Sequence, residues 1–149
     1  MINVETLIKL LKKNNCNFFT GVPDSVLKDL SSSLKNKSKK NHIIATSEGS
    51  ATSVGIGYYL ATKKIPCIYM QNSGLSNALN PLISIAHKKV YSIPLILIIG
   101  WRGSPKLKDE PQHNVKGKIT KQILKLLNIN FTVLRSEKDL NKFDKQIKS

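Results

Sequence analysis

The sequence predicts a doubly wound α/β domain with a mainly parallel sheet and helices on both faces. Short apolar runs alternate along the chain with segments whose apolar residues recur at helical spacing. Val4, Leu7, Ile8 and Leu11 give the first of these helical patterns. The run at 94–99 consists mainly of branched apolar residues, which is typical of a strand in a parallel sheet.

The expected elements alternate from one end of the chain to the other. We expect strands at 16–20, 42–45, 66–70, 94–99 and 130–134. We expect helices at 4–13, 26–34, 48–64, 75–88, 119–127 and 137–147. Asn3, either Asp24 or Ser25, and Ser47 are placed to cap three of the helices. We expect a solvated loop at 35–41 and a long loop at 100–118, and loops of that length in compact domains are usually functional or disordered.

Composition limits the class of protein. The 149 residues include 24 basic and 9 acidic side chains, for a net charge of +15. The lysines are scattered and lack interleaved aromatic residues, so we interpret them as a solvated coat and do not expect nucleic-acid binding. Cys16 and Cys67 have no metal-binding spacing, and we expect two buried reduced thiols. A signal-peptide pattern is missing and the apolar runs are too short to span a bilayer, so we expect a cytoplasmic protein.

The expected strands end in unusual residues. Polar and glycine residues follow four of them, at 21–24, 47–49, 71–74 and 100–103. In parallel α/β sheets ligands bind at the carboxyl ends of the strands, so we place the site there. The dinucleotide fingerprint, the P-loop and the Gly-x-Ser-x-Gly elbow are missing, and isolated histidines predict no metal site in this chain.

Glu48 is a lone carboxylate among small residues, directly after the strand expected at 42–45, whose end we expect to be buried. One interpretation is that it compensates the positive end of the next helix, which is worth a few tenths to about 1 kcal/mol. That interpretation does not explain the small residues around it. Gly55 and Gly57 in the same helix indicate close packing against another backbone.

Five segments in this order resemble a known family. They are 21–25, 47–51, 69–75, 100–103 and 109–113. They resemble the N-terminal, pyrimidine-binding domain of phosphonopyruvate decarboxylases, which are thiamine diphosphate enzymes, and are similar to the α subunit of sulfopyruvate decarboxylase. The resemblance covers about residues 3–135. It implies the thiamine diphosphate-binding fold of the pyrimidine type, with residues 1–149 forming a single pyrimidine-binding domain.

The resemblance also implies a reaction. In these enzymes one glutamate, matched here by Glu48, hydrogen-bonds N1′ of the cofactor's aminopyrimidine and favours the tautomer that deprotonates thiazolium C2. The cofactor then accepts electrons as a 2-oxo acid loses CO₂. We expect a carboxy-lyase that converts phosphonopyruvate to phosphonoacetaldehyde. The alternatives are the α subunit of a sulfopyruvate decarboxylase and a non-catalytic α/β binding module that kept the fold.

Further roles come from the same resemblance. Asn72, Ser73 and Gly74 are expected to bind the cofactor, with an ordinary capped turn as the alternative. Asp24 is expected to assist proton transfer, with helix capping as the alternative.

The expected substrate contacts come from the long loop. Arg102 would bind an anionic group of the substrate, with a structural salt bridge as the alternative. Gln112 and His113 would contact the substrate, and His113 would also act in catalysis; an exposed His113 without a role is the alternative.

A second protein part is implied. Enzymes of this kind hold the diphosphate through Mg²⁺ on another domain that bears a Gly-Asp-Gly motif, and this sequence has no such motif. We therefore expect a diphosphate-binding β chain or C-terminal domain as partner, a small 2-oxo acid as substrate, and a hetero-oligomer.

Overall fold

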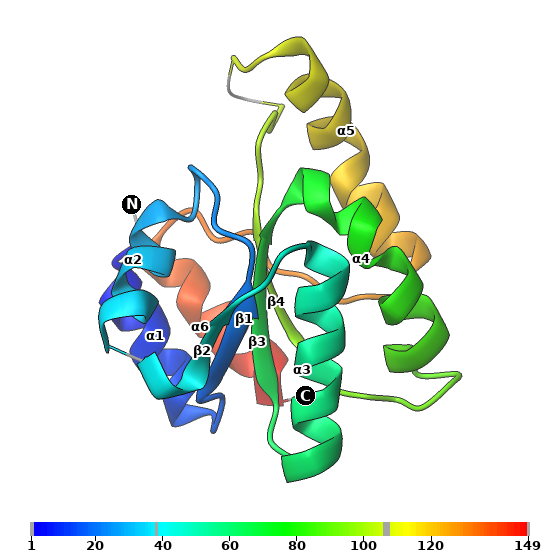
Figure 1. The fold of residues 1–149 in the computed structure, drawn as a ribbon. Coiled ribbons are helices and arrows are strands. Elements are labelled where there is room, and N and C mark those ends of the chain that lie inside the picture. Colours follow the sequence, from blue (N-terminus) through cyan, green and yellow to red (C-terminus); the bar gives the residue numbers. More distant parts are fainter. Residues whose placement is uncertain (1, 38, 106–107, 149) are drawn as a thin grey trace.

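Four parallel strands form the sheet, in the order β2-β1-β3-β4 (Figure 1). The computed structural model describes residues 2–37, 39–105 and 108–148. The strands are β1 (Phe18–Gly21), β2 (His42–Ile44), β3 (Pro66–Gln71) and β4 (Ile96–Gly100). In the register, Gly21 lies beside Ile44 and Tyr69, and Gln71 lies beside Gly100. All four carboxyl ends therefore lie at one edge, as the expected α/β fold requires.

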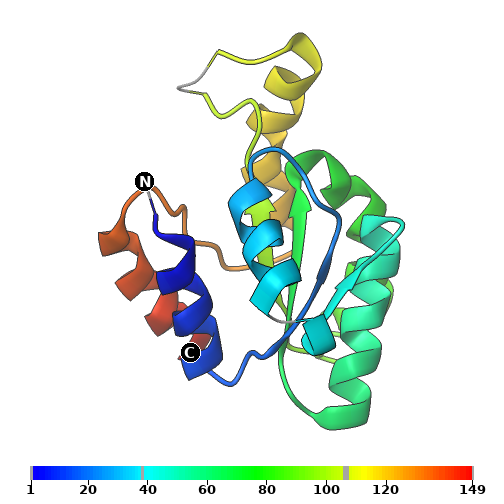
Figure 2. The same cartoon turned by 60° about the vertical axis from the view of Figure 1, so that its left-hand side comes forward.

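Helices cover both faces of the sheet (Figures 1 and 2). One face carries α1 (Val4–Lys13), α2 (Lys28–Lys37) and α6 (Glu137–Lys148). The other carries α3 (Glu48–Thr62), α4 (Leu75–Pro81) and α5 (Pro111–Leu126). Along β3, Cys67 and Tyr69 pack into the first core, while Ile68 and Met70 pack into the second. This alternation is what the two-residue period of a strand produces.

Two of the expected caps fix helix starts. The side-chain oxygen of Asn3 accepts hydrogen bonds from the amides of Glu5 (2.9 Å) and Thr6 (3.2 Å). The hydroxyl of Ser47 accepts one from the amide of Ser50 at 3.2 Å. Both side chains satisfy donors that the first helical turn leaves without partners.

The strand expected to be buried at 42–45 is an exposed edge strand. Ile43 is 46% exposed and Ile44 is 53% exposed. An apolar sequence does not distinguish a strand buried by its own chain from a strand at the rim of the sheet. The close packing against another backbone that was expected for Gly55 and Gly57 of α3 is not what the structure shows. Gly55 packs on the side chain of Ile68 on β3, whereas Gly57 faces open space.

The loop predicted at 100–118 is wrong in its second half, because α5 begins at Pro111. Proline suits the first position of a helix, where its missing N–H has no partner to lose. Residues 106–107 of that loop lie outside the described residues. The loop predicted at 35–41 is also mostly helical. There α2 continues to Lys37 and a 3₁₀ turn spans Lys39–Asn41, and residue 38 lies outside the described residues.

The helix predicted at 75–88 divides in two. α4 ends at Pro81, and a π-helical turn covers Leu82–Ala86. Proline has no N–H to donate to the carbonyl four residues earlier, which belongs to Asn77. That carbonyl instead faces Gly49 at the start of α3, where a Cβ would lie 2.8 Å from it.

The strand predicted at 130–134 does not form among the described residues. Phe131 packs against one core and Leu134 against the other, so the apolar side chains are used without backbone pairing. A cavity of about 1070 Å³ lies along β4 and is lined by residues of β4, α5, α6 and this segment. The sequence pattern reports burial, which does not require the hydrogen bonds of a strand.

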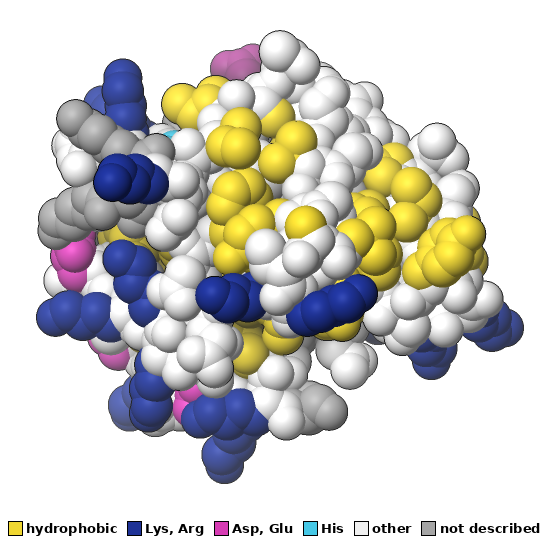
Figure 3. Space-filling model, turned by 60° about the horizontal axis from the view of Figure 1, so that its bottom comes forward, with side chains coloured by type: hydrophobic (Ala, Val, Ile, Leu, Met, Phe, Trp, Pro, Cys, Tyr) yellow, Lys and Arg dark blue, Asp and Glu magenta, His cyan; other side chains and the backbone are white. Residues whose placement is uncertain are grey.

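The two cysteines are free and buried, as expected. They are distant in sequence but neighbours in space: a hydrogen bond with Cys16, together with burial, raises the pKa of the Cys67 thiol. In the face shown in Figure 3, apolar side chains gather over the middle and right of the molecule, and most Lys and Arg side chains lie along its left and lower margins. Among the described residues, no helix is both long and apolar enough to cross a membrane.

Two helical glycines allow a matched test of the contact between α5 and the loop that follows β4. A Cβ on Gly117 would lie 1.7 Å from the carbonyl oxygen of Gly103, which has a φ of +64°. We expect Gly117→Ala to lower the free energy of unfolding by about 1–3 kcal/mol through overpacking. Gly57→Ala, with open space at its Cβ, should leave it unchanged or raise it by up to about 1 kcal/mol. Urea denaturation measures both, and equal effects would contradict the assigned contact.

Candidate functional site

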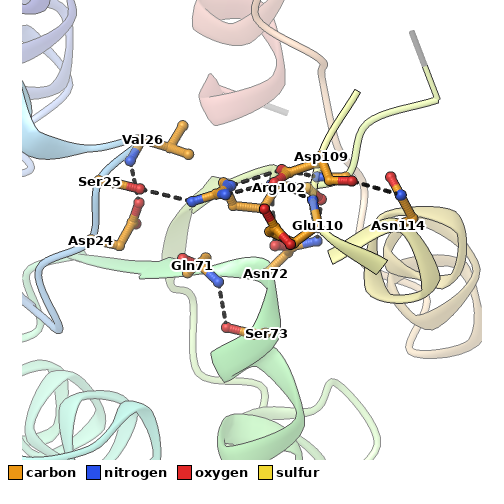
Figure 4. A network of polar contacts seen from close by, with 11 residues as sticks. Asp24, Ser25, Val26, Gln71, Asn72, Ser73, Arg102, Asp109, Glu110 and Asn114 are labelled. Carbon is orange, nitrogen blue, oxygen red and sulfur yellow. Dashed lines mark hydrogen bonds and ion pairs between the residues drawn. The ribbon is translucent and has the colours of Figure 1, made fainter. Parts of the chain in front are cut away.

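The segments that follow β1, β3 and β4 meet at the carboxyl edge of the sheet (Figure 4). Arg102, after β4, donates through Nη1 to the hydroxyl of Ser25, after β1, at 3.1 Å. Asn72, after β3, exchanges hydrogen bonds with the backbone of Arg102. Glu48, after β2, lies against Gly74 in the segment that follows β3. Four of the residues singled out from the sequence, Glu48, Asn72, Gly74 and Arg102, thus lie in segments that contact one another at this edge.

Glu48 lies in the first turn of α3 and is partly buried. A Cβ on Gly74 would lie 2.2 Å from both Cδ and Oε1 of Glu48, so a larger residue at position 74 would displace this carboxylate from its present position. Asn77 of α4 donates to Oε2 at 2.9 Å. Among the described residues, nothing hydrogen-bonds to Oε1. The site therefore holds a positioned carboxylate with one oxygen available.

Asn72 is buried and joins three elements. Its Nδ2 donates to the carbonyl of Arg102 (3.0 Å) and to the hydroxyl of Thr120 on α5 (2.9 Å). Its Oδ1 accepts from the amide of Arg102 at 3.2 Å. Both amide N–H groups are thereby used, so the side chain of Asn72 braces the end of β4 and α5 against the turn after β3.

Arg102 forms a bidentate ion pair with Asp109. Its Nε donates to Oδ2 at 2.8 Å and its Nη2 to Oδ1 at 2.6 Å. The backbone amides of Gly103 and Glu110 donate to the same carboxylate, each at 2.9 Å. The Arg102 guanidinium and these amides hold the pKa of the Asp109 carboxyl well below its usual range, and the hydrogen bond to Asp109 raises the pKa of Arg102. This ion pair corresponds to the structural salt bridge that was the alternative to substrate binding for Arg102.

Asp24 uses one oxygen and leaves the other without a partner. Its Oδ1 accepts from the amides of Val26 and Leu27, which fixes the turn that leads into α2. Its Oδ2 is buried and makes no hydrogen bond among the described residues. A Cβ on Gly100 would lie 2.9 Å from Oδ2. A buried carboxylate oxygen without a donor is costly, which makes Asp24 a candidate contact for a ligand.

Ser73 is the middle residue of the short 3₁₀ turn Asn72–Gly74 beside Glu48. Its hydroxyl accepts a hydrogen bond from Nε2 of Gln71 at 2.7 Å. Its carbonyl accepts from the hydroxyl of Ser76 at 3.0 Å and from Nζ of Lys116 on α5 at 3.4 Å. A lysine that received no role from the sequence therefore reaches this edge.

Gln112 and His113 lie in the first turn of α5 and not in a loop. Gln112 is exposed and His113 partly buried, and neither side chain hydrogen-bonds to another described residue. Trp101 packs on the same helix: its indole N–H donates to the carbonyl of Gly117 at 2.9 Å, and Lys121 lies over its ring. No hydrogen bond among the described residues links the side chains of Gln112 and His113 to Glu48 or Asp24.

Sequence reasoning missed three contributors to this edge: Asn77, Asp109 and Lys116. Asn77 follows Gly74 by three residues, which is one helical turn, so its spacing gave a weak signal. Asp109 lies seven residues after Arg102 in a non-repetitive segment, where spacing does not fix geometry. Across the described part of the chain, no three His, Cys, Asp or Glu side chains converge as metal ligands.

These features define a parallel α/β domain that presents a partly buried carboxylate at the ligand-binding edge of its sheet. The chain belongs to the family described as thiamine pyrophosphate enzyme, N-terminal TPP binding domain, which it matches over residues 2–124. The family expected from the sequence is thus confirmed.

Two curated relatives differ in length. Phosphonopyruvate decarboxylase of Streptomyces viridochromogenes is 34% identical over 139 residues, which is 93% of this chain and 34% of that protein. Sulfopyruvate decarboxylase subunit alpha of Methanococcus maripaludis is 35% identical over 127 residues, which is 85% of this chain and 74% of that subunit. The chain therefore spans about a third of the first relative and about three quarters of the second.

A solved structure supports the fold. Benzoylformate decarboxylase from Polynucleobacter necessarius superposes with a TM-score of 0.57 at 24% identity, covering 74% of this chain and 20% of that one. At this identity the likeness extends to the fold alone.

The ion pair between Arg102 and Asp109 predicts a pH dependence. Because the pKa of Asp109 is lowered in the folded chain, the pair adds stability above the unfolded value of about 3.9 and loses it as the pH falls below that value. Asp109→Asn should therefore be less stable than the unmutated chain at pH 6. The difference should shrink between pH 4 and pH 2, as followed by urea denaturation. A difference that stays constant over this range would contradict the ion pair.

Proposed function

We propose that this chain supplies the aminopyrimidine-binding side of a thiamine diphosphate-dependent 2-oxo acid decarboxylase. The observation that supports this most is the Glu48 carboxylate, held over Gly74 by Asn77 with Oε1 available. A ring nitrogen of an aminopyrimidine is the kind of polar group that such an oxygen would bind, so the residues present fit the cofactor. When bound, thiamine diphosphate supplies an electron sink for the loss of CO₂.

Glu48 would hold the proton at the ring nitrogen of the pyrimidine through Oε1. Asn77 fixes the other oxygen, which leaves the carboxylate one orientation and lowers the entropy lost on binding. Partial burial strengthens the hydrogen bond relative to water. Glu48 can both compensate the positive end of α3 and activate the cofactor, because its position in the first turn of the helix allows both roles.

The other residues receive roles consistent with their contacts. Ser73 and Gly74 would line the cofactor cleft, while Asn72 would act through its brace on the end of β4. Asp24 would meet the reacting atoms through Oδ2, the oxygen that has no partner among the described residues.

Arg102, Gln112 and His113 would face the substrate side, and His113 would exchange protons there. Arg102 would do so while paired with Asp109, since its guanidinium has five N–H donors and the described contacts use three of them.

The remaining binding functions belong to a second protein part in this proposal. Residues 1–149 act as a single pyrimidine-binding domain, and a diphosphate-binding β chain or C-terminal domain holds Mg²⁺ and the diphosphate. The relatives support this arrangement, since one of them is a subunit alpha of which this chain covers 74%. The active form is then a hetero-oligomer, and the site is expected to function in the cytoplasm.

The proposed substrate is phosphonopyruvate, which would give phosphonoacetaldehyde and CO₂. Sulfopyruvate is the second candidate, favoured by the similar identity of the alpha subunits. A non-catalytic binding module is the third candidate. It predicts that adding thiamine diphosphate to the assembled protein causes no release of CO₂ from either 2-oxo acid.

Reconstitution tests the proposal. The chain with thiamine diphosphate and Mg²⁺ alone should release no CO₂ from either 2-oxo acid. Adding the diphosphate-binding chain encoded with it, or extending the chain to its full gene product, should give cofactor-dependent release from phosphonopyruvate or sulfopyruvate. Robust turnover by residues 1–149 alone would contradict the divided site, and no turnover by the assembled protein with either substrate would contradict the proposed activity.

A further inference from the structure

We infer that Lys116 binds the second anionic group of the substrate, at the end opposite its 2-oxo carboxylate, and so selects 2-oxo acids with two anionic groups over those with one. The inference rests on the proposed function and deepens it. It assigns to Lys116 a contact that neither the sequence analysis nor the comparisons provide.

Lys116 reaches the site from α5. Its Nζ lies 3.4 Å from the carbonyl of Ser73, the residue that precedes Gly74, and the side chain is partly buried. The distance is at the limit of a hydrogen bond, and a neutral carbonyl compensates an ammonium only weakly. Within the described part of the chain, no carboxylate lies within ion-pair distance of Nζ. The ammonium thus has donors available for an anion.

The backbone that carries Lys116 is fixed on both sides of the following turn. Gly117 packs against the carbonyl of Gly103, and its own carbonyl accepts from Trp101. Thr120 accepts from Asn72 and donates to the carbonyl of Lys116 at 2.6 Å. These contacts hold the Cα of Lys116 in place, whereas its four-carbon stem can still reposition Nζ.

Charge at this edge favours Lys116 over Arg102 for a new anion. Arg102 is already neutralised by the bidentate pair with Asp109, and an incoming anion would have to compete with that carboxylate. Asp24, Glu48 and Glu110 add further negative charge, which opposes binding of a substrate with two anionic groups. A cation without a carboxylate partner is what such a substrate requires, and Lys116 supplies one.

The phosphonate and the sulfonate share this chemistry but differ in charge. A phosphonate carries up to two negative charges near neutral pH and a sulfonate carries one. Lys116 should therefore contribute to binding of both groups and contribute more to binding of the phosphonate.

Calorimetry on the assembled enzyme with bound cofactor tests the inference without turnover. The probes are 3-phosphonopropanoate and 3-sulfopropanoate, which carry both anionic groups and lack the reactive carbonyl. We expect Lys116→Gln to weaken 3-phosphonopropanoate binding about tenfold or more, as the loss of a hydrogen bond to a charged group does. Lys116→Arg, which keeps the positive charge, should retain most of the affinity of the unmutated enzyme for 3-phosphonopropanoate. Lys118→Gln, which removes an exposed lysine from the same helix, should bind like the unmutated enzyme.

Separate readouts distinguish the possible failures. Three results would each overturn the assignment. The first is equal probe affinity of Lys116→Gln and Lys118→Gln, and the second is absence of probe binding by the unmutated enzyme. The third is a loss of thiamine diphosphate affinity in Lys116→Gln that parallels the loss of probe affinity. Urea denaturation of Lys116→Gln checks that folding is unchanged, and if it is not, Lys116→Arg provides the decisive comparison with Lys118→Gln. An assembled enzyme that binds the probes through Lys116 but releases no CO₂ would refute the proposed reaction and leave the anion site standing.

Discussion

The contact between the Glu48 carboxylate and Gly74 is the constraint on which the site depends. It requires that the first turn of α3 and the turn after β3 lie side by side, which the packing of α3 against β3 and α4 provides. Gly49 adds a second close approach, since its Cα faces the carbonyl of Asn77 that Pro81 leaves without an N–H. At the start of α3, glycine at position 49 is therefore explained by its closeness to the backbone of α4.

A second constraint fixes the segment after β4 at the same edge of the sheet. Asn72 hydrogen-bonds to the end of β4 and to α5, which connects both to the turn after β3. The ion pair of Arg102 with Asp109 joins two parts of the segment that follows β4. In this network both N–H groups of the Asn72 amide and three of the five N–H groups of Arg102 have acceptors. The groups it leaves without strong partners, Oδ2 of Asp24 and Nζ of Lys116, are the ones with capacity for a ligand.

The sequence predicted features that local chemistry or strand order determines. The caps at Asn3 and Ser47 depend on residues within one turn, and the site edge follows from where parallel strands end. Partners brought together by irregular segments were not predictable, as the pair of Arg102 with Asp109 shows. Apolar patterning also predicted a strand at 130–134, where Phe131 and Leu134 are partly buried against the two cores without backbone pairing. The apolar pattern indicates which side chains pack against the core, whereas backbone pairing of a strand depends on the whole sheet.

Hydrogen–deuterium exchange at C2 of thiamine diphosphate tests most directly whether Glu48 activates the cofactor. In the assembled enzyme, Glu48→Gln should slow this exchange by about a hundredfold or more, since one charge-assisted hydrogen bond to a reacting group is worth that much. Glu110→Gln removes a carboxylate from the same edge and should leave the exchange unchanged. If Glu48→Gln exchanges as fast as the unmutated enzyme with cofactor bound, Glu48 only compensates its helix and the account is contradicted.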